Sequence, residues 1–445
     1  MVGKINKKSG KLRFGRLRKF VFSKEIHILA KGNNLESFTR NRKMTLSLII
    51  YSILLRKGKT LSMDLRDFFK KTGKNSSVSR QAYMKQRRKL NPEVFRRLND
   101  FYLNDFYDSE EEVLTWKDYV VMAIDGSKAE IPNSEANRNK YGIAQNKEQD
   151  GCARALISGL YDVNNNFFLD LQIFNVNGSE KKAAENNIKA LERIKINHPV
   201  LIIFDRNYPS IEFMNKLKEN NISFLIRLKS TDYIKERKSI DANDSKIELI
   251  HTWQRLYTIK KANRKSHEKL KNKKSTEARL VKCLSPEGNE ISFITNLPEN
   301  ISTEEICNEY FKRWKIELAY NTLKNKMKLE SVSGKSTIYV KQDFLAQILV
   351  YNLAKDLMNS AEKELKNNQK KSKYPVRINE NIALGVFRED FIELMMEDDA
   401  VKRDKKYVAL QKEMENYYLP KRKSDSKKRK FHPANKYASN LKPSF

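Results

Sequence analysis

The hydrophobic pattern changes its period once along the chain, near residue 118. Before that point apolar residues recur at three- and four-residue spacing, which is typical of amphipathic helices. After it, short apolar runs of strand length alternate with helical stretches. The sequence therefore predicts a helical N-terminal region followed by an α/β region.

The N-terminal region predicts several helices in succession. They cover 44–55, 62–71 up to Gly73, a basic helix from the Ser79 cap to Leu90, and another that starts at Asn91-Pro92. The basic helix suits the second helix of a helix-turn-helix, which would place Arg80, Lys85, Arg87 and Arg88 on DNA. An ordinary helical bundle with a solvated basic face accounts for the same pattern equally well.

The α/β region opens with a buried strand over 119–124 that is expected to stop at Asp125-Gly126. Strands over 154–163 and 167–176 flank a three-asparagine hairpin turn. The pattern then predicts a helix over 180–196, a strand over 200–204, a helix over 211–220 and a strand over 223–228. This order predicts a mixed sheet with helices on both faces.

From residue 229 to about 290 the sequence is polar and rich in lysine, with strand-like runs at 256–259 and 278–284. We interpret this segment as an inserted β-rich lobe. Helices are expected over 302–330 and 338–359, and the tail from Pro420 is basic.

The charge of the chain indicates a class of partner: Lys and Arg number 88 against 55 Asp and Glu, a formal charge of +33. Such an excess favours a polyanion, nucleic acid first, because neutralised phosphates release condensed counterions. A lysine- and asparagine-rich genome bias is the alternative, but it would usually raise the acidic content as well.

Several classes of protein are disfavoured by simple counts. The longest apolar stretch, 47–55, is far shorter than the ~18 residues of a membrane span, and no signal-peptide pattern is present. Cys152, Cys283 and Cys307 lie far apart, so neither a disulfide framework nor a zinc site is expected. The five histidines form no cluster. We expect a protein of the reducing cytosol, without a membrane.

Two carboxylates are placed at the ends of predicted buried strands, Asp125 and Asp205. Strand ends of an α/β sheet project side chains into a shared crevice, which favours a site. Each aspartate could instead simply cap a turn, and either one alone would favour that simpler role.

A third element comes from one predicted helix, in which Tyr310, Arg313, Glu317 and Lys324 stand at i, i+3, i+7 and i+14. At about 100° per residue they fall within an arc of about 60°. The apolar residues outside the arc predict a polar face sunk between packed flanks: Phe311, Trp314, Ile316, Leu318, Leu323 and Met327. An exposed salt-bridged stripe is the alternative, although Arg before Glu is the weaker order for helix support.

The spacing Tyr310-x2-Arg313-x3-Glu317-x6-Lys324 resembles the signature of DDE transposases of bacterial insertion sequences, of the insertion-sequence-four group. Asp125, in Asp-Gly-Ser, and Asp205, in Asp-Arg-Asn-Tyr, resemble the other two motifs of that group. Asn207 stands where glycine is more usual. The resemblance covers roughly residues 40–360.

The resemblance implies a ribonuclease-H-like mixed-sheet catalytic core in which Asp125, Asp205 and Glu317 are the catalytic acids and metal ligands. It implies two Mg²⁺ ions, with Mn²⁺ able to substitute, and DNA contacts by Tyr310, Arg313 and Lys324. Hard carboxylate oxygens suit such ions. The implied partners are double-stranded DNA, as terminal inverted repeats and target, and a second copy of the chain in a paired-end complex at the bacterial nucleoid.

The resemblance also implies a cut-and-paste transposase and a division of the chain. The expected parts are a helical DNA-binding region (1–112), the first part of the core (113–228), the inserted lobe (229–295), the second part of the core (296–360) and a C-terminal helical region with a basic tail (361–445). In hairpin-forming relatives the lobe supplies a tryptophan that stacks on a flipped base. The corresponding strand, 291–296, has none; Phe293 is the nearest aromatic residue and Trp253 a more distant one, and both are expected to be core residues.

Two other functions remain open. One is a ribonuclease-H-like nuclease that cleaves without joining. The other is a catalytically silent DNA-binding inhibitor of transposition, against which the three intact carboxylates count, since a pure DNA binder has no use for acids beside phosphate.

Overall fold

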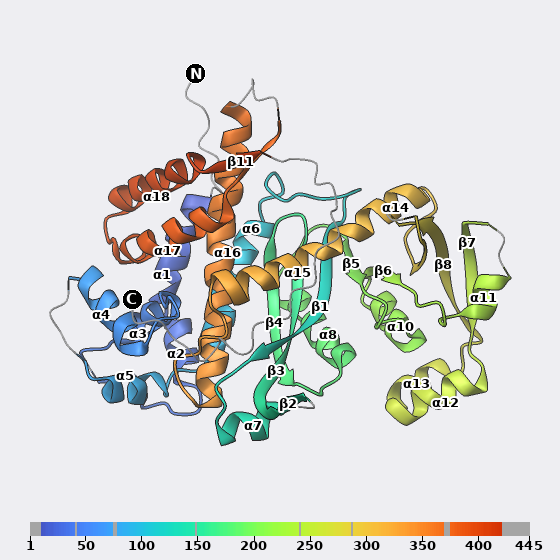
Figure 1. The fold of residues 1–445 in the computed structure, drawn as a ribbon, viewed down its shortest axis with the longest axis horizontal. Coiled ribbons are helices and arrows are strands. Elements are labelled where there is room, and N and C mark those ends of the chain that lie inside the picture. The colour runs from blue at the N-terminus through green and yellow to red at the C-terminus, as the bar shows by residue number, and fades with distance from the viewer. Residues whose placement is uncertain are drawn as a thin grey trace.

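The computed structural model describes residues 10–40, 42–73, 78–146, 149–239, 242–285, 288–368 and 374–420. Helices from both ends of the chain gather at one end of the elongated molecule, and a large sheet fills the middle and the other end (Figure 1). The basic tail expected after Pro420 lies outside the described residues. In the described part of the chain, no helix is long and apolar enough to cross a membrane.

The N-terminal region is helical, as predicted. Its helices are α1 (Gly10–Val21), α2 (Lys24–Lys31), α3 (Leu46–Leu54), α4 (Leu61–Lys71), α5 (Arg80–Arg87) and α6 (Glu93–Tyr107). The Ser79 hydroxyl accepts a hydrogen bond from the backbone N–H of Ala82 at 3.2 Å and so begins α5. Gly73, which has a φ of +62°, lies just after the end of α4, where the chain leaves the helix. Helix α5 ends before Leu90, because residues 88–90 leave the helix as turns.

Within the described residues, nine strands join in one mixed sheet. The strands are β1 (Val120–Glu130), β2 (Ile143–Asn146), β3 (Gln149–Asp162), β4 (Phe167–Asn175), β5 (Val200–Phe204), β6 (Ser223–Arg227), β7 (Asp244–Ile250), β8 (Ser275–Leu284) and β9 (Glu290–Thr295). Their order is β2-β3-β1-β5-β6-β9-β8-β7, with β4 also paired to β3. Strand β3 runs antiparallel to β1, whereas β5 runs parallel to β1, and β6 parallel to β5.

Alternate residues of β1 enter two different hydrophobic cores, because successive side chains of a strand point to opposite faces. Val121 and Ala123 pack into the core that also contains the N-terminal helices. Val120, Met122 and Ile124 pack into the second core, on the other face. Helices α8 (Glu180–Ile188), α9 (Ala190–Arg193) and α10 (Ile211–Glu219) contribute to the second core, and a break at Lys189 divides the single helix expected over 180–196.

The segment 229–295 departs from its prediction in one element. The expected strand at 256–259 is part of a helix, because Thr252 caps α12 (Trp253–Ala262) and only Ile259 of that helix is buried. The segment also contains α11 (Ile234–Lys238) and α13 (Arg264–Leu270), while its strands β7, β8 and β9 continue the central sheet beyond β6.

The expectation of no disulfide is wrong for one pair. Cys283 in β8 and Cys307 in α14 (Thr303–Tyr310) form a disulfide, and Cys152 is free. The two cysteines are 24 residues apart, so only the packing of α14 against β8 brings them together. No spacing rule in the sequence could have indicated this contact.

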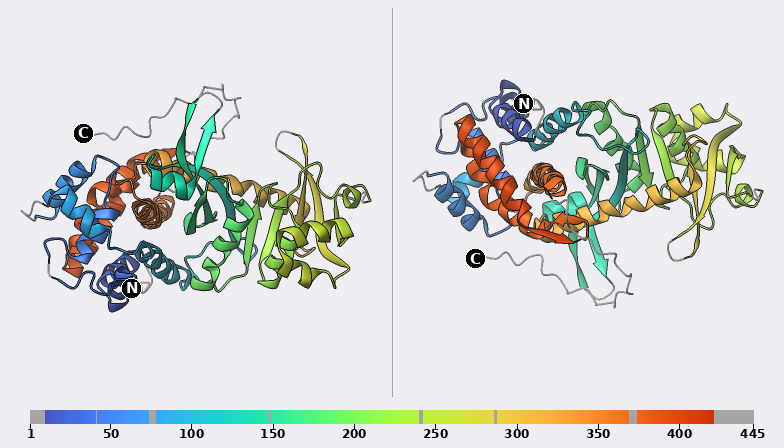
Figure 2. Two further views of the ribbon diagram at one scale, coloured as in Figure 1. Left: turned by 90° about the horizontal axis from the view of Figure 1, so that it is seen from below. Right: turned by 90° about the horizontal axis from the view of Figure 1, so that it is seen from above.

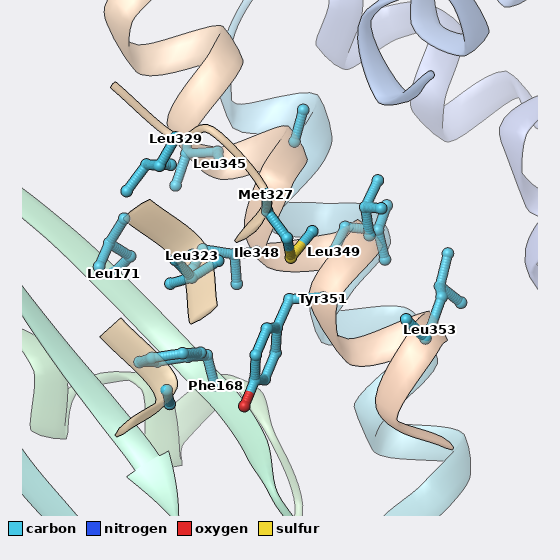
Figure 3. Packing of buried hydrophobic residues seen from close by; sticks show 14 of the residues in the cluster. Phe168, Leu171, Leu323, Met327, Leu329, Leu345, Ile348, Leu349, Tyr351 and Leu353 are labelled. Atoms are coloured by element: carbon cyan, nitrogen blue, oxygen red, sulfur yellow. The ribbon is translucent and has the colours of Figure 1, made fainter. Parts of the chain in front are cut away.

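The second half of the α/β region leads into a 32-residue helix, α16 (Thr337–Asn368), which passes through the middle of the helical end of the molecule (Figure 2). Helices α17 (Glu380–Met396) and α18 (Ala400–Glu415) pack nearby, with the short pair β10 (Val376–Ile378) and β11 (Tyr418–Pro420). Figure 3 shows Tyr351 of α16 close to Phe168 of β4, with Leu323 and Met327 packed in the same core.

A buried charge cluster joins α16 to the N-terminal helices. Asp343 pairs with Arg56 at 2.7 Å and with Arg87 of α5 at 2.6 Å. Its carboxylate also accepts hydrogen bonds from the backbone N–H and hydroxyl of Ser333. Burial raises the pKa of Asp343, but the two guanidiniums and Ser333 more than offset this, so the pKa lies well below its usual range.

We expect Asp343→Ala to lower the free energy of unfolding by about 3–5 kcal/mol, because two buried guanidiniums would lose their shared partner. Urea denaturation followed by circular dichroism would measure the loss. The matched control is Glu25→Ala, which breaks the partly exposed pair between Glu25 and Arg97 and should cost no more than about 1 kcal/mol. Equal losses for the two variants would contradict the structural role assigned to Asp343.

Candidate functional site

Asp125 lies inside β1 and not at its end, because the strand continues to Glu130 through its pairing with β3. The parallel partner β5 pairs with β1 only as far as Ala123 and Ile203. Asp125 therefore stands just beyond the point where that neighbour stops. The prediction that the strand stops at Asp125 is wrong. Among the described residues, Asp125 nevertheless has no strand beside it on the β5 side, because β5 pairs with β1 only as far as Ala123.

Asp205 directly follows β5, as predicted, and is partly buried. One carboxylate oxygen accepts the backbone N–H of Asn207 at 2.8 Å, and the other accepts the Asn207 side-chain amide at 3.3 Å. Such a turn is typical of aspartate. Asn207, the departure from the family motif, thus holds the carboxylate in place from two sides.

The segment that carries Tyr310, Arg313, Glu317 and Lys324 is not one regular helix. Helix α14 ends at Tyr310, a 3₁₀ turn covers Phe311–Arg313, α15 covers Trp314–Asn321, and a π turn covers Thr322–Lys326. The prediction of a single arc at 100° per residue is therefore wrong in detail, since 3₁₀ turns are wound more tightly and π turns more loosely.

Arg313 lies between two of the expected acids. Its guanidinium is 3.6 Å from a carboxylate oxygen of Asp125 and donates to Glu317 at 2.8 Å. The side chain is buried, and its charged carbon lies 4.9 Å from the centre of the Trp314 ring. One guanidinium thus links the middle of β1 to the first turn of α15.

The electrostatics place Asp205 close to the same cluster. Burial raises the pKa of Asp125 to about 7; Arg313 and the Gly126 N–H oppose this rise, while the charges of Asp205 and Glu317 add to it. The site therefore collects more negative charge than Arg313 neutralises.

Lys324 contacts the same strand a little further along. From the π turn its ammonium donates to the Ser127 hydroxyl at 2.7 Å and to the Lys128 carbonyl at 2.6 Å. Burial lowers its pKa, and the charge of Glu330 partly offsets this. The structure thus brings Lys324 within two residues of Asp125 along the strand.

Tyr310 is more deeply buried than a surface contact residue. It is 3% exposed, and its ring centre lies 4.5 Å from that of Phe293 in β9. Burial raises its pKa, which Arg313 and Arg227 counteract and Asp205 reinforces. Tyr310 therefore borders the cluster from inside the core.

The expected packed flanks of the polar face are present on one side only. Ile316, Leu323 and Met327 are buried, as predicted. Trp314 and Leu318 are 50% and 64% exposed, so an apolar pair one turn apart faces solvent beside the carboxylates. The sequence could not separate the two sides, because both are equally apolar.

Two further residues of the site were missed from the sequence. Glu180 begins α8, and its carboxylate oxygen would lie 3.2 Å from a Cβ at position 126, so the glycine after Asp125 leaves room for it. Burial and the charge of Asp205 raise the pKa of Glu180. Tyr320 of α15 donates its hydroxyl to the Asp125 carbonyl at 2.8 Å. In the sequence, only the glycine after Asp125 indicated that another side chain packs closely at this point.

The remaining predicted residues lie elsewhere. Arg80 and Lys85 on α5 and Arg88 directly after it are exposed, and α5 lies in the helical end of the molecule (Figure 1), away from the carboxylates. Arg87, expected beside them on DNA, is instead fully buried with Asp343. That expectation is wrong because the residue turns inward from the helix.

Of the two aromatic residues expected in the core of the lobe, only Phe293 is buried. Phe293 is fully buried in β9, which excludes it as a residue that stacks on a base. Trp253, expected in the core, is 74% exposed and stacks on Tyr257 with ring centres 5.2 Å apart. Trp253 and Tyr257 belong to α12, in which only Ile259 is buried.

The acidic residues suit a divalent cation in their chemistry, because they supply hard carboxylate oxygens. Among the described residues, however, no three acidic, histidine or cysteine side chains are close enough together to hold an ion as they stand. Arg313 occupies the position between Asp125 and Glu317.

Comparison with known proteins gives a consistent result. A family model described as "Transposase DDE domain" matches residues 116–353, more than half of the chain. A probable transposase for insertion sequence element IS5377 from Geobacillus stearothermophilus is 25% identical over 167 residues, which is 37% of this chain and 41% of that relative. The match thus spans about two fifths of the relative's length.

Among solved structures, the chain is similar to the cryo-EM structure of the piggyBac transposase synaptic complex with hairpin DNA. The identity is 12%, the superposition covers 92% of this chain and 85% of that chain, and the TM-score is 0.46.

The raised pKa of Asp125 predicts how stability depends on pH in the presence of a chelator. The unfolded value lies near 3.8 and the folded value near 7, so this group's contribution to stability is present at low pH and is lost as the pH rises through 7. Asp125→Asn should therefore raise the melting temperature more at pH 8 than at pH 5, by an amount equivalent to roughly 1–3 kcal/mol. The same increase at both pH values would show that the carboxylate is not perturbed.

Proposed function

This chain belongs to the transposase DDE domain family, and from that membership we propose that it is a transposase of an insertion sequence, of the insertion-sequence-four group. In this proposal it binds the terminal inverted repeats of its element, cleaves the DNA, and joins the freed 3′-hydroxyl to target DNA by a cut-and-paste route. The observation that carries the proposal is that the buried Arg313 contacts both Asp125 and Glu317, while the charge of Asp205, from a third segment, acts on Asp125.

The strand order supports a ribonuclease-H-like core for this chain. Strands β4, β3 and β1 form an antiparallel set, and β5 and β6 follow parallel to β1 in the order β4-β3-β1-β5-β6. Asp125 and Asp205 lie on neighbouring strands of this set, and α15 brings Glu317 to the same place. We propose these three residues as the catalytic acids.

The proposed metal ligands are the same three carboxylates. Bound there, two Mg²⁺ ions, or Mn²⁺ in their place, supply the Lewis acidity that activates water or a 3′-hydroxyl and stabilises the leaving oxygen. Arg313 would have to release Asp125 and Glu317 as they turn to ligation. The released guanidinium is then available to a DNA phosphate, to which a planar donor fork is suited.

Lys324 and Tyr310 take different parts in this proposal. Lys324 uses two of its three N–H donors on Ser127 and Lys128, which leaves one for a phosphate near the cleaved end. Tyr310 packs behind Arg313, so any contact it makes with DNA requires it to move outward from the core. The geometry supports the first role, whereas only the family signature supports the second.

The other parts of the chain are assigned by position. We propose 1–112 as the region that recognises the terminal repeat, with Arg80, Lys85 and Arg88 on its exposed basic helix, 113–228 and 296–360 as the two parts of the core, 229–295 as an insertion over the DNA, and 361–445 as a C-terminal helical region with a tail. A second copy of the chain would complete a paired-end complex.

A nuclease that does not join DNA, or a silent DNA-binding inhibitor, would share much of this structure. Incubation of the protein with labelled DNA that carries an intact terminal repeat, and separately with a pre-cleaved end, each with a plasmid target, separates the three. We expect joined products in Mg²⁺. Cleavage without joining would favour the nuclease, and binding alone would favour the inhibitor.

Alanine at Asp125, Asp205 or Glu317 should reduce cleavage to background while binding to the terminal repeat survives, because each change removes a proposed metal ligand and no phosphate contact. Binding without metal should even strengthen slightly, as one charge repelling phosphate is lost. Gel assays of nicking and binding on the same labelled DNA would measure both. Glu304→Ala, an exposed change on neighbouring α14, is the control, and nicking at the wild-type rate by any triad variant would remove that residue from the triad.

Neutralising Arg313 or Lys324 should weaken binding to a pre-cleaved end and lower the slope of log affinity against log salt by about one unit at most. Each side chain is expected to hold one phosphate near the cut. Fluorescence anisotropy at several salt concentrations would measure the slope, with the exposed Lys182→Ala in α8 as the control. If both alanine variants kept the wild-type affinity and slope, the basic side of the site would have no part in holding DNA.

A further inference from the structure

Glu380 is the first residue of α17 and lies outside the region matched by the family model. It contacts the π turn that carries Lys324. One carboxylate oxygen accepts the Thr322 hydroxyl at 2.5 Å and lies 3.3 Å from the Lys326 ammonium. Thr322 and Lys326 are the first and last residues of the π turn. A single carboxylate therefore holds both ends of that turn.

The position of Glu380 is itself fixed from a third element. Its second oxygen accepts the Lys355 ammonium of α16 at 3.0 Å. Burial raises the pKa of Glu380, but Lys355, Thr322 and Lys326 lower it to about 2, so the carboxylate is ionised at any physiological pH. Lys355 is mostly buried, so this ion pair ties the second carboxylate oxygen of Glu380 to α16.

The turn that Glu380 holds has unusual winding. The backbone N–H of Met327 donates to the Thr322 carbonyl at 2.9 Å, five residues earlier, and that of Leu329 donates to the Leu323 carbonyl, six residues earlier. Arg388, also of α17, donates to the Lys326 carbonyl at 3.4 Å. Wide turns of this kind are rare in helices and are frequent at functional sites.

Lys324 stands in the middle of this turn and faces away from Glu380, towards β1, where it binds Ser127 and Lys128. If the turn relaxed to regular α-helix, its own residues, Lys324 among them, would rotate about the helix axis, because an α-helix turns each residue by more than the wider π turn does. Lys324 would then lose its fixed approach to the strand that carries Asp125.

We propose that Glu380 is a positioning residue of the site: it clamps the π turn and so aims Lys324 at the segment that follows Asp125. The inference rests on the proposed contact between Lys324 and the cleaved DNA end. Glu380 itself touches no DNA in this account and acts only through Lys324.

A double-mutant cycle tests the inference on binding to a pre-cleaved end. Glu380→Ala should weaken binding by about three- to tenfold, and should weaken it no further in a Lys324→Ala protein, because coupled residues are not additive. Thr322→Val, which removes only the hydroxyl contact and leaves the pair with Lys355, should show a smaller loss that also vanishes in Lys324→Ala. Glu389→Ala is the matched control: it lies on the same helix, pairs with Lys57 and Lys71, and should change nothing.

Hydrogen exchange provides a readout that does not depend on DNA. Peptides that contain the Met327 and Leu329 amides should exchange faster in Glu380→Ala than in wild type or Glu389→Ala, while α16 stays protected. An unchanged exchange rate would show that Glu380 does not hold the turn and would overturn the inference.

The outcomes separate this inference from the proposed function. Equal losses from Glu380→Ala with and without Lys324 would make Glu380 merely structural. No loss from Glu380→Ala, when Lys324→Ala still weakens binding, would overturn the clamp but leave the proposed function intact. No effect of Lys324→Ala alone would reject the DNA contact of Lys324, and the inference would fall with that contact.

Discussion

The structure depends on one electrostatic constraint: carboxylates from distant parts of the chain must be held close together although their like charges repel. Arg313 meets this constraint by standing between Asp125 and Glu317 in a buried position. The neutralisation is incomplete, because one guanidinium stands against three carboxyl groups, and burial together with the charges of Asp205 and Glu317 raises the pKa of Asp125. A site with residual negative charge at its centre is suited to attract divalent cations, and the guanidinium that stabilises it beforehand is suited to move onto a phosphate afterwards.

The second requirement is that the segment carrying Arg313, Glu317 and Lys324 stays in register with β1. Contacts at intervals achieve this: the Tyr320 hydroxyl binds the Asp125 carbonyl, and the Lys324 ammonium binds Ser127 and Lys128. Behind the segment, α16 and α17 supply Lys355 and Glu380. The same α16 carries Asp343, which pairs with Arg87 of the basic helix. One long helix thus connects the proposed DNA-recognition region to the support of the proposed active site.

The sequence predicted most of the elements, because hydrophobic period and motif spacing depend on local chemistry. It also singled out Asp125, Asp205 and Glu317, whose catalytic role stays a prediction. It did not predict how the elements are wound or which neighbours they meet. The 3₁₀ and π turns around α15 depend on contacts with β1 and Glu380, and β1 continues past Asp125 because β3 pairs with it. The inward turn of Arg87 depends on an aspartate 256 residues away. Residues 256–259 include β-branched and aromatic side chains, which are typical of a strand. They are helical because the Thr252 cap begins α12 there.

The measurement that tests the central claim most directly is affinity cleavage of the protein by Fe²⁺ bound in place of Mg²⁺. With ascorbate and peroxide, a bound iron ion generates hydroxyl radicals that cut the backbone beside its ligands. If Asp125, Asp205 and Glu317 hold one ion centre, fragments should end near all three positions, disappear with excess Mg²⁺, and be lost together in Asp125→Ala. Cleavage near only one of the three, or an unchanged pattern in Asp125→Ala, would contradict the account.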